Sequence, residues 1–555
     1  MNTKMKRIIT RYCQAVFGLG SLLILSLWLV ACKDNFLDEK PLASLSSDVV
    51  LTSKAGFDNY LTALHQAARE ELSYEDNHDY YFTLHSGTDI ATTGQEDARP
   101  FRNYVTYLTP AANTVTKYWM WAYKLMLVRA NTIIVYANKP ELKGIWTSEA
   151  EKNAIIAEAR FFRAYTHNAL ANLYGGVPIV DTIYTGPKTD FVRNSRKQVY
   201  ESARADLEFA SQWLPATVEK SQEGRIVKAA ADHLLTEVYM SLGEHDKAVA
   251  SASRVIDSGL YKLMNARFGS EKDLPGDPYS DLFKLGNQNR SSGNLESIYV
   301  WQFEDQTPGG QGGTAGNNIL RGWGPWYINL RDPDGKAGMI IVDSLGRGVG
   351  LTRPTTYFLY NLWEGNWSND MRNSPHNIRR TMYYTNPASA YFRKPVEAKT
   401  TRIDTMQNLF PTLRKIEGKV GKSGNNTTGR TFSDFMVYRL ADTYLLRAEA
   451  NFRKGDLAKA AADINVVRAR ANAKPVGASS VTIDYILDER ARELIAEEPR
   501  RRTLIRMGKL VERTRKYNMR EDTRSSIQNY HEFFPIPQTA IDANFSAKLE
   551  QNPGY

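Results

Sequence analysis

Aromatic rings beside hydrogen-bonding side chains suit a ligand that has an apolar face and a polar rim, such as a sugar ring. Residues 321–329 hold this mixture. Trp323 is the leading candidate, because Gly322 and Gly324 would leave its ring free to be presented. Packing within the loop explains Trp323 and Trp326 equally well, and both alternatives stay open. The candidate ligand-binding residues of this segment are Arg321, Trp323, Trp326, Tyr327 and Asn329.

A second segment, residues 74–103, combines the same kinds of side chain. Tyr80 and Tyr81 are adjacent, so at most one of them faces a ligand if the segment is extended. Aromatic loops on a rigid scaffold are where binding residues concentrate. The candidate ligand-binding residues of this segment are Tyr80, Tyr81, Asp89 and Arg99.

A hydrolase is the competing hypothesis, and it needs two carboxylates that face each other across a cleft. Acid pairs occur at Glu75-Asp76 and Glu304-Asp305, but adjacent side chains usually point apart. The chain has no His-Glu-x-x-His, Gly-x-Ser-x-Gly or phosphate-loop motif, and its His residues are scattered. The sequence therefore favours binding without catalysis, metal or cofactor, and a purely structural scaffold is the third hypothesis.

The amino terminus has the layout of an export signal. A basic start leads into an apolar run, residues 15–30, which is shorter than the roughly 20 residues that span a bilayer. Leu29-Val30-Ala31-Cys32 follows and resembles the lipobox of bacterial lipoproteins, in which the Cys is acylated. Cys13 lies within the segment to be removed, so Cys32 would be the one Cys of the mature chain. The alternative is an ordinary signal peptide with an accidental Cys.

The charge balance argues against a nucleic-acid partner. The formal net charge of the whole chain is +10, and four of the basic residues lie within residues 1–31, where there is no acidic residue. The excess that remains is small for this size, and no long basic run with interleaved aromatic residues appears.

Helical periodicity marks two parts of the chain that must position these residues. Apolar residues recur with helical spacing at 115–137, 149–173, 197–214, 225–242 and 245–256, and again at 435–454, 457–471 and 483–495. In both parts a Gly is followed by Ala after five residues and by Val after twelve, as in Gly243 and Gly455. This pattern resembles a tetratricopeptide unit of two helices joined at a Gly turn.

Between these parts lies a segment rich in Gly, Asn, Trp and Tyr, in which residues 297–301 could form a strand. Trp363 and Trp367 are four residues apart and are expected to pack. The predicted organisation is a signal peptide (1–31), a lipidated tether (32–50), a first helical-repeat part (51–273), a loop-rich ligand-binding insert (274–432), and a second helical-repeat part with an extended tail (433–555).

Several blocks in order resemble the SusD/RagB family over nearly the whole chain after Cys32. These blocks are Asp34-Asn35-Phe36-Leu37-Asp38, Tyr123 with Arg129-Ala130-Asn131, Ala157-Glu158-Ala159-Arg160 with Leu173-Tyr174-Gly175-Gly176, Arg353-Pro354-Thr355, Tyr438-Arg439-Leu440-Ala441-Asp442, and Gln551-Asn552-Pro553-Gly554-Tyr555. One departure is Pro499-Arg500-Arg501-Arg502, in which Arg501 and Arg502 stand where the family usually has aromatic residues; Pro499 predicts an altered helix junction there.

The resemblance implies a mainly α fold of tetratricopeptide-like repeats with a large loop-rich insert. It also implies a lipid-anchored outer-membrane protein that is exposed at the cell surface. Such a protein captures oligosaccharide and passes it to a SusC-like TonB-dependent β-barrel. The helical side would meet the barrel. The alternative within the family is a RagB-like protein that binds peptides.

Overall fold

The computed structural model describes residues 46–72, 83–97, 99–305, 307, 316–418 and 429–555. It divides into two units, residues 1–52 and 53–555, and α2 (Ser47–Val50) is the helix described in the first. None of the helices within the described ranges combines the length and apolar composition that a bilayer crossing requires. All elements below belong to the second unit.

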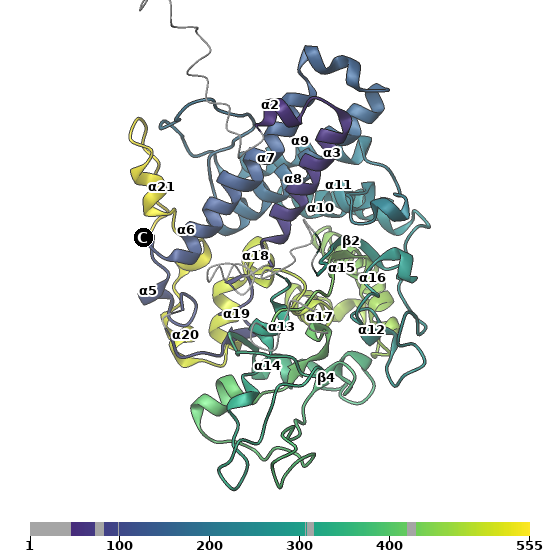
Figure 1. The fold of residues 1–555 in the computed structure, drawn as a ribbon, viewed down its shortest axis with the longest axis vertical. Helices are drawn as coiled ribbons and strands as arrows, with labels where there is room; N and C mark the ends of the chain where they lie inside the picture. The colour runs from purple at the N-terminus through teal and green to yellow at the C-terminus, as the bar shows by residue number, and fades with distance from the viewer. Residues whose placement is uncertain (1–45, 73–82, 98, 306, 308–315, 419–428) are drawn as a thin grey trace, which may run out of the picture. The chain divides into compact units, whose positions relative to one another are not determined.

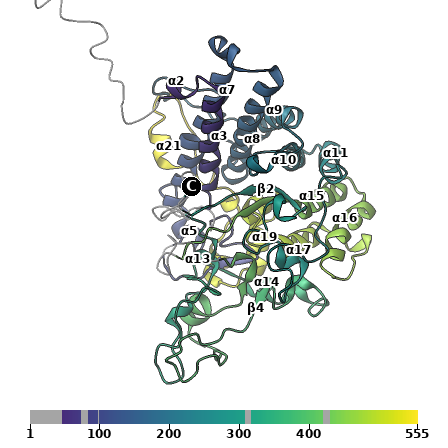
Figure 2. The same ribbon diagram turned by 45° about the vertical axis from the view of Figure 1, so that its right-hand side comes forward.

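The first helical part follows the predicted periodicity closely. The longest helix, α8, begins after Ser148, whose side chain accepts a hydrogen bond from the Glu151 amide, and it ends at Gly175 with a φ of 77°. α8 packs against α7 and α9, and these helices lie together in the upper part of Figures 1 and 2. The helices are α3 (Lys54–Arg69), α5 (Tyr104–Tyr107), α6 (Asn113–Met120), the π-helical η1 (Trp121–Met126), α7 (Leu127–Ala137), α8 (Glu149–Tyr174), α9 (Arg196–Trp213), α10 (Lys228–Ser241) and α11 (His245–Ile256).

The two copies of the helix–Gly–helix pattern pack side by side. α10 and α11 form one pair, α15 (Leu440–Arg453) and α16 (Leu457–Arg470) form the other, and α11 contacts α15 (Figures 1 and 2). Gly243 and Gly455 follow the first helix of each pair with φ of 76° and 81°, which favours Gly. The mainly α, tetratricopeptide-like prediction is therefore confirmed.

The start of the later helix was predicted wrongly. Residues 435–439 form the strand β6 (Phe435–Arg439), and α15 begins at Leu440. β6 pairs antiparallel with β2 (Ser297–Trp301), the strand that the sequence predicts. Pairing with a distant strand overrides the local helical pattern here, and it joins the beginning and the end of the insert.

The rest of the insert is built from short elements. Two further antiparallel pairs are β1 (Ala91–Thr93) with β3 (Thr352–Pro354), and β4 (Ile378–Arg379) with β5 (Thr412–Leu413). The short helices are α12 (Pro278–Asp281), α13 (Ile319–Trp323) and α14 (Thr356–Leu359), and α13, α14 and β4 lie in the lower part of Figure 1.

The carboxyl-terminal part continues with α17 (Ile483–Leu494), α18 (Arg500–Arg506), α19 (Leu510–Tyr517), α20 (Glu521–Ser526) and α21 (Gln538–Asp542). The break between α17 and α18 falls where Pro499 predicts it, and Pro499 is the residue that precedes the first turn of α18. Ala496 in this break has a φ of 62°, which a side chain rarely adopts.

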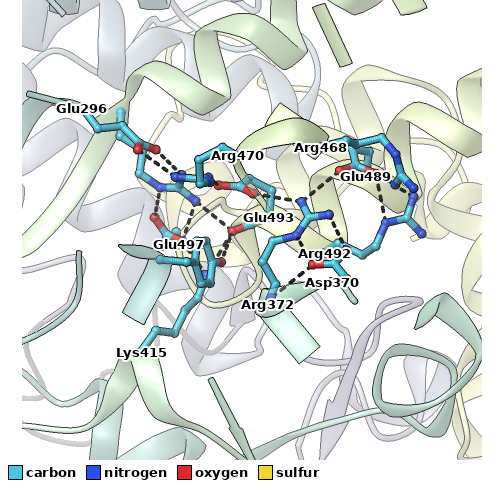
Figure 3. Close-up of polar contacts among 12 residues, drawn as sticks. Glu296, Asp370, Arg372, Lys415, Arg468, Arg470, Glu489, Arg492, Glu493 and Glu497 are labelled. Atoms are coloured by element: carbon cyan, nitrogen blue, oxygen red, sulfur yellow. Dashed lines mark hydrogen bonds and ion pairs between the residues drawn. The ribbon is translucent and has the colours of Figure 1, made fainter. Parts of the chain in front are cut away.

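A buried cluster of carboxylates and guanidinium groups ties the insert to the helices (Figure 3). Glu493 on α17 accepts hydrogen bonds from Arg372 of the insert at 2.9 Å, from Arg439 of β6 and from Arg470 of α16. Glu489, one helical turn earlier, pairs with Arg372 at 2.9 Å and with Arg468 at 2.7 Å. All these groups are buried, so each charge depends on the others for its stability.

The substitution Glu493→Gln is expected to destabilise the fold by about 3–5 kcal/mol, because it leaves three buried guanidinium groups short of a negative charge. The check is the midpoint of urea unfolding. The matched control is Glu149→Gln, since Glu149 pairs with Lys152 at the surface and its side chain is 68% exposed. Equal midpoints for the two variants would contradict the role given to the cluster.

Candidate functional site

The predicted binding segment at residues 74–103 is fixed where β1 pairs with the middle of the insert. In the β1–β3 pair, Thr93 lies opposite Thr352, and the pairing continues as the Gly94 amide donates to the Leu351 carbonyl at 3.1 Å. A Cβ on Gly94 would lie 2.3 Å from the Gly350 carbonyl oxygen. Only glycine permits this approach of the two backbones.

The predicted binding segment at residues 321–329 joins the same stretch of the insert. The Val349 amide donates to the Arg321 carbonyl at 2.9 Å, and the Gly350 amide donates to the Gly324 carbonyl at 2.8 Å. A Cβ on Gly348 would meet Gly324 backbone at 2.2 Å. Gly324, which follows Trp323, therefore serves close backbone packing.

The Val349 peptide group is the point at which the two segments meet, because its amide donates to the Arg321 carbonyl. The Val349 carbonyl accepts hydrogen bonds from the side-chain amides of Gln95 and Gln407, each at 3.1 Å. The Gln95 side chain in turn accepts a hydrogen bond from Arg99 at 3.0 Å. The Gln407 carbonyl accepts the Trp326 amide at 2.8 Å. Residues far apart in sequence are thus gathered around one peptide group.

The gathered side chains that remain accessible define what is here named the two-segment site. Trp326 is partly buried, and its indole Nε1 has no hydrogen-bond partner among the described residues. Asn329 is exposed, while Arg99 and Arg321 are partly buried. Arg99 also pairs with Asp97 at 3.0 Å. An indole, guanidinium groups and amides are groups that can stack on a ring and hydrogen-bond its rim.

Trp323 and Tyr327 lie in the interior, in contrast to a presented Trp323 ring. Trp323 is 0% exposed, and its ring meets that of His85 edge-on with centroids 5.4 Å apart. Tyr327 packs with Leu330 and Met382 and donates its hydroxyl hydrogen bond to the Gly346 carbonyl. Burial raises the pKa of Tyr327 to about 12. Neither ring reaches the surface of the two-segment site.

Asp89 is also buried, and its partners are two guanidinium groups. Arg500 donates to its carboxylate at 3.0 and 2.6 Å, and Arg513 donates at 2.7 Å. Burial alone would raise the pKa of Asp89, but the charges of Arg500 and Arg513 outweigh it and lower the pKa to about 2. Asp89 thus holds the residues before β1 on α18 and α19.

Three other predicted residues, Tyr80, Tyr81 and Cys32, lie outside the described residues. Conversely, the expectation that Trp363 and Trp367 both pack is half wrong. Trp363 is 0% exposed, but Trp367 is 47% exposed. Gly365 between them has a φ of 75°, so the chain turns and the helical spacing does not apply. Gly365 is the sequence feature that could have indicated this turn.

Two family models match the chain. One is described as SusD family and matches residues 355–555; the other is described as starch-binding, associating with the outer membrane, and matches residues 35–240. SusD-like protein P2 of Formosa agariphila is 25% identical and covers 96% of this chain and 98% of its own length. The starch-binding protein SusD of Bacteroides thetaiotaomicron is 36% identical over 125 residues, which is 22% of each chain.

Solved structures share the fold over nearly the whole chain. A laminarin-binding SusD-like protein matches with a TM-score of 0.69 and 22% identity, covering 91% of this chain and 100% of its own. Surface glycan-binding protein A from Bacteroides thetaiotaomicron, in complex with laminarihexaose, matches with a TM-score of 0.69 and 20% identity, covering 90% of this chain and 100% of its own.

The substitution Asp89→Asn is expected to lower the free energy of unfolding at neutral pH by about 3–5 kcal/mol, because two buried guanidinium groups lose their counter-charge. Since the folded-state pKa of Asp89 is lowered to about 2, its contribution is present above the ordinary value of 3.8 and is lost as the pH falls toward 2. Urea unfolding between pH 7 and pH 2 checks this.

The variant should therefore show a weaker loss of stability with acid than the unchanged chain. Asp190→Asn is the control, because Asp190 pairs with Lys188 at the surface and is 57% exposed. A stable Asp89→Asn chain with unchanged acid sensitivity would contradict the structural role.

Proposed function

The chain belongs to the SusD/RagB family, and from that premise we propose that it is a cell-surface glycan-binding lipoprotein. It captures oligosaccharide and delivers it to a SusC-like TonB-dependent β-barrel in the outer membrane. The insert, residues 274–432, supplies most of the ligand contacts. The helical-repeat parts, residues 51–273 and 433–555, carry the insert and meet the barrel.

One observation supports this proposal above the others: both segments with ligand-type side chains meet at Val349, whose carbonyl accepts the Gln95 side chain and whose amide donates to the Arg321 carbonyl. Trp326 offers a partly accessible indole, whose Nε1 is itself buried and has no partner among the described residues. A sugar ring would stack on the accessible part of the indole, while Arg99, Arg321 and Asn329 reach the hydroxyl rim. The relatives named for laminarin and starch point to glucans as the first probes.

Anchoring completes the proposal. Cys32 is the acylated residue, and several acyl chains give the stable membrane attachment that a single chain does not. Residues 33–50 then act as a tether between the membrane and the folded body. Labelling of the cells with a palmitate analogue tests this, and a Cys32→Ser chain that keeps the label would contradict it.

Binding without turnover is the proposed mode of action, since one curated relative is named a starch-binding protein. The alternative is a RagB-like uptake of peptides, because aromatic rings and guanidinium groups suit peptides as well. A glycan hydrolase is the less favoured alternative. Heat released by peptide mixtures in calorimetry would support peptide uptake. Shortened glycans in chromatography after long incubation would support a hydrolase.

We expect native electrophoresis of the mature chain, in gels that contain laminarin or amylopectin, to show retardation by at least one glucan. Trp326→Ala should weaken the retarding interaction about tenfold, which corresponds to about 1.4 kcal/mol for the lost stacking. Gln95→Ala should weaken it less, because Gln95 positions the loops through Val349.

Trp146→Ala is the matched control, because it removes a partly buried indole of the helical part that packs on Phe57. Retardation that survives Trp326→Ala would keep the glycan function and remove the two-segment site from it. Absence of retardation, with heat released by peptides, would turn the function to peptide uptake.

A further inference from the structure

Two aromatic rings that do not belong to the two-segment site stand exposed and parallel on the insert. Tyr360 is 44% exposed and Trp367 is 47% exposed. Their ring planes differ by 7°, and their centroids are 6.2 Å apart. The pair follows α14, which lies in the lower part of Figures 1 and 2. Large apolar rings normally lie inside, so a matched exposed pair requires an explanation.

The guanidinium group of Arg380 fixes the orientation of both rings. It lies 4.6 Å from the Trp367 ring centre and 5.9 Å from that of Tyr360. Arg380 is itself held, since it donates to the Leu359 carbonyl at 2.8 Å and to the Asn373 side chain at 2.6 Å. Cation–π contact with a fixed guanidinium keeps the rings in place, and nearly half of each side chain remains exposed.

The turn that carries Trp367 is tied to the helical scaffold. The Trp367 carbonyl accepts the Asn373 side-chain amide at 2.8 Å. The Asn366 side chain accepts the Lys474 amide at 2.9 Å, and the Met371 amide donates to the Ala471 carbonyl at 2.9 Å. Residues 471–474 directly follow α16. The rings are therefore positioned before any ligand arrives, which lowers the entropic cost of binding.

Polar groups border the rings. Asn361 and Glu364 are exposed and hydrogen-bonded to each other at 3.0 Å, so an amide N–H, a carbonyl and a carboxylate stand beside the aromatic surface. The Arg380 guanidinium adds further donors next to the rings. This is the mixture that holds the C–H face and the hydroxyl rim of a sugar.

We propose that Tyr360 and Trp367, with Arg380, Asn361 and Glu364, form a second carbohydrate-binding surface, here named the aromatic platform. Two parallel rings in a fixed orientation suit two successive sugar units of one chain. A protein partner is a poorer fit, because a stable protein interface needs roughly 800 Å² on each side and the rings are bordered at once by charged and amide groups. The inference rests on the proposed glycan function and adds a second contact to it.

A second contact of this kind changes how ligand length affects affinity. A polysaccharide with many repeats can occupy the aromatic platform and the two-segment site on one chain or rebind between them, which raises the apparent affinity. A short oligosaccharide can occupy one at a time. Loss of the platform should therefore weaken polysaccharide binding more than the binding of a hexasaccharide at the two-segment site.

The test uses the mature chain in detergent, in affinity electrophoresis with laminarin and amylopectin and in calorimetry with laminarihexaose and maltohexaose. Trp367→Ala and Tyr360→Ala should each weaken polysaccharide retardation about fivefold to tenfold. Trp367→Phe should restore most of it, because a ring is retained. Tyr184→Ala is the matched control, since Tyr184 is 45% exposed but meets Phe191 edge-on at 81°.

The outcomes separate the two proposals. Retardation of the unchanged chain that is equal in Trp367→Ala, Tyr360→Ala and Tyr184→Ala overturns the platform and leaves the glycan function standing. Retardation reduced by the platform variants and by Trp326→Ala supports both surfaces. Reduction by the platform variants alone supports the platform and removes the two-segment site. Absence of retardation by either glucan overturns both proposals.

Discussion

The carboxylate of Glu493 is enclosed by guanidinium groups that arrive from three separate parts of the chain. Arg372 comes from the insert, Arg439 from β6 and Arg470 from the end of α16. Each of these ions would pay a large desolvation penalty if it were buried alone, and the penalty is offset only when all are together. The insert therefore cannot separate from the helices without leaving several charges exposed or unpaired. The position of the insert on the helices depends on this cluster.

Both candidate binding surfaces are supported from buried ion clusters. Arg372 also pairs with Asp370 at 2.7 Å, three residues after Trp367, so the turn of the aromatic platform ends on the Glu493 cluster. Asp89, two residues before β1, pairs with Arg500 and Arg513. It thereby fixes the segment that carries β1, which is one of the two segments of the two-segment site. In both places a solvent-facing loop carries a buried charged residue that forms ion pairs in the interior. These ion pairs fix the position of loops that have little apolar core of their own.

The sequence predicts the helices well and the site less well, for a physical reason. Helical periodicity is local, so the lengths of α8 and α11 could be derived from apolar spacing alone. The exposure of a loop side chain depends on partners that are distant in sequence. Asp89 is buried in an ion pair with Arg500, which lies 411 positions later. No local sequence pattern predicts that pairing. The family resemblance indicates which segments matter, but it does not indicate which of their rings point inward.

The glycines around Trp323 illustrate the same limit. Flexible neighbours suggest a free ring, but Gly324 is needed because the Gly348 backbone passes within contact distance. A glycine is compatible with an exposed neighbouring ring or with close backbone packing. Which of the two occurs depends on whether another part of the chain approaches the glycine. At Gly365 the opposite holds, because its positive φ turns Trp367 away from Trp363 and out of the core.

The departure at Pro499-Arg500-Arg501-Arg502 shows how charged residues can replace rings at a packed junction. The guanidinium of Arg501 lies over the Phe101 ring, 3.7 Å from the ring centre, and is fully buried. It also donates to the carbonyls of Thr83 and Ser86 at 2.9 and 2.6 Å, which an aromatic ring cannot do. Because residues 83–86 lead into Asp89 and β1, the substituted junction supplies hydrogen bonds to the segment that carries half of the two-segment site. The altered residues at the helix break thus act on the position of a loop that lies about 400 residues earlier in the chain.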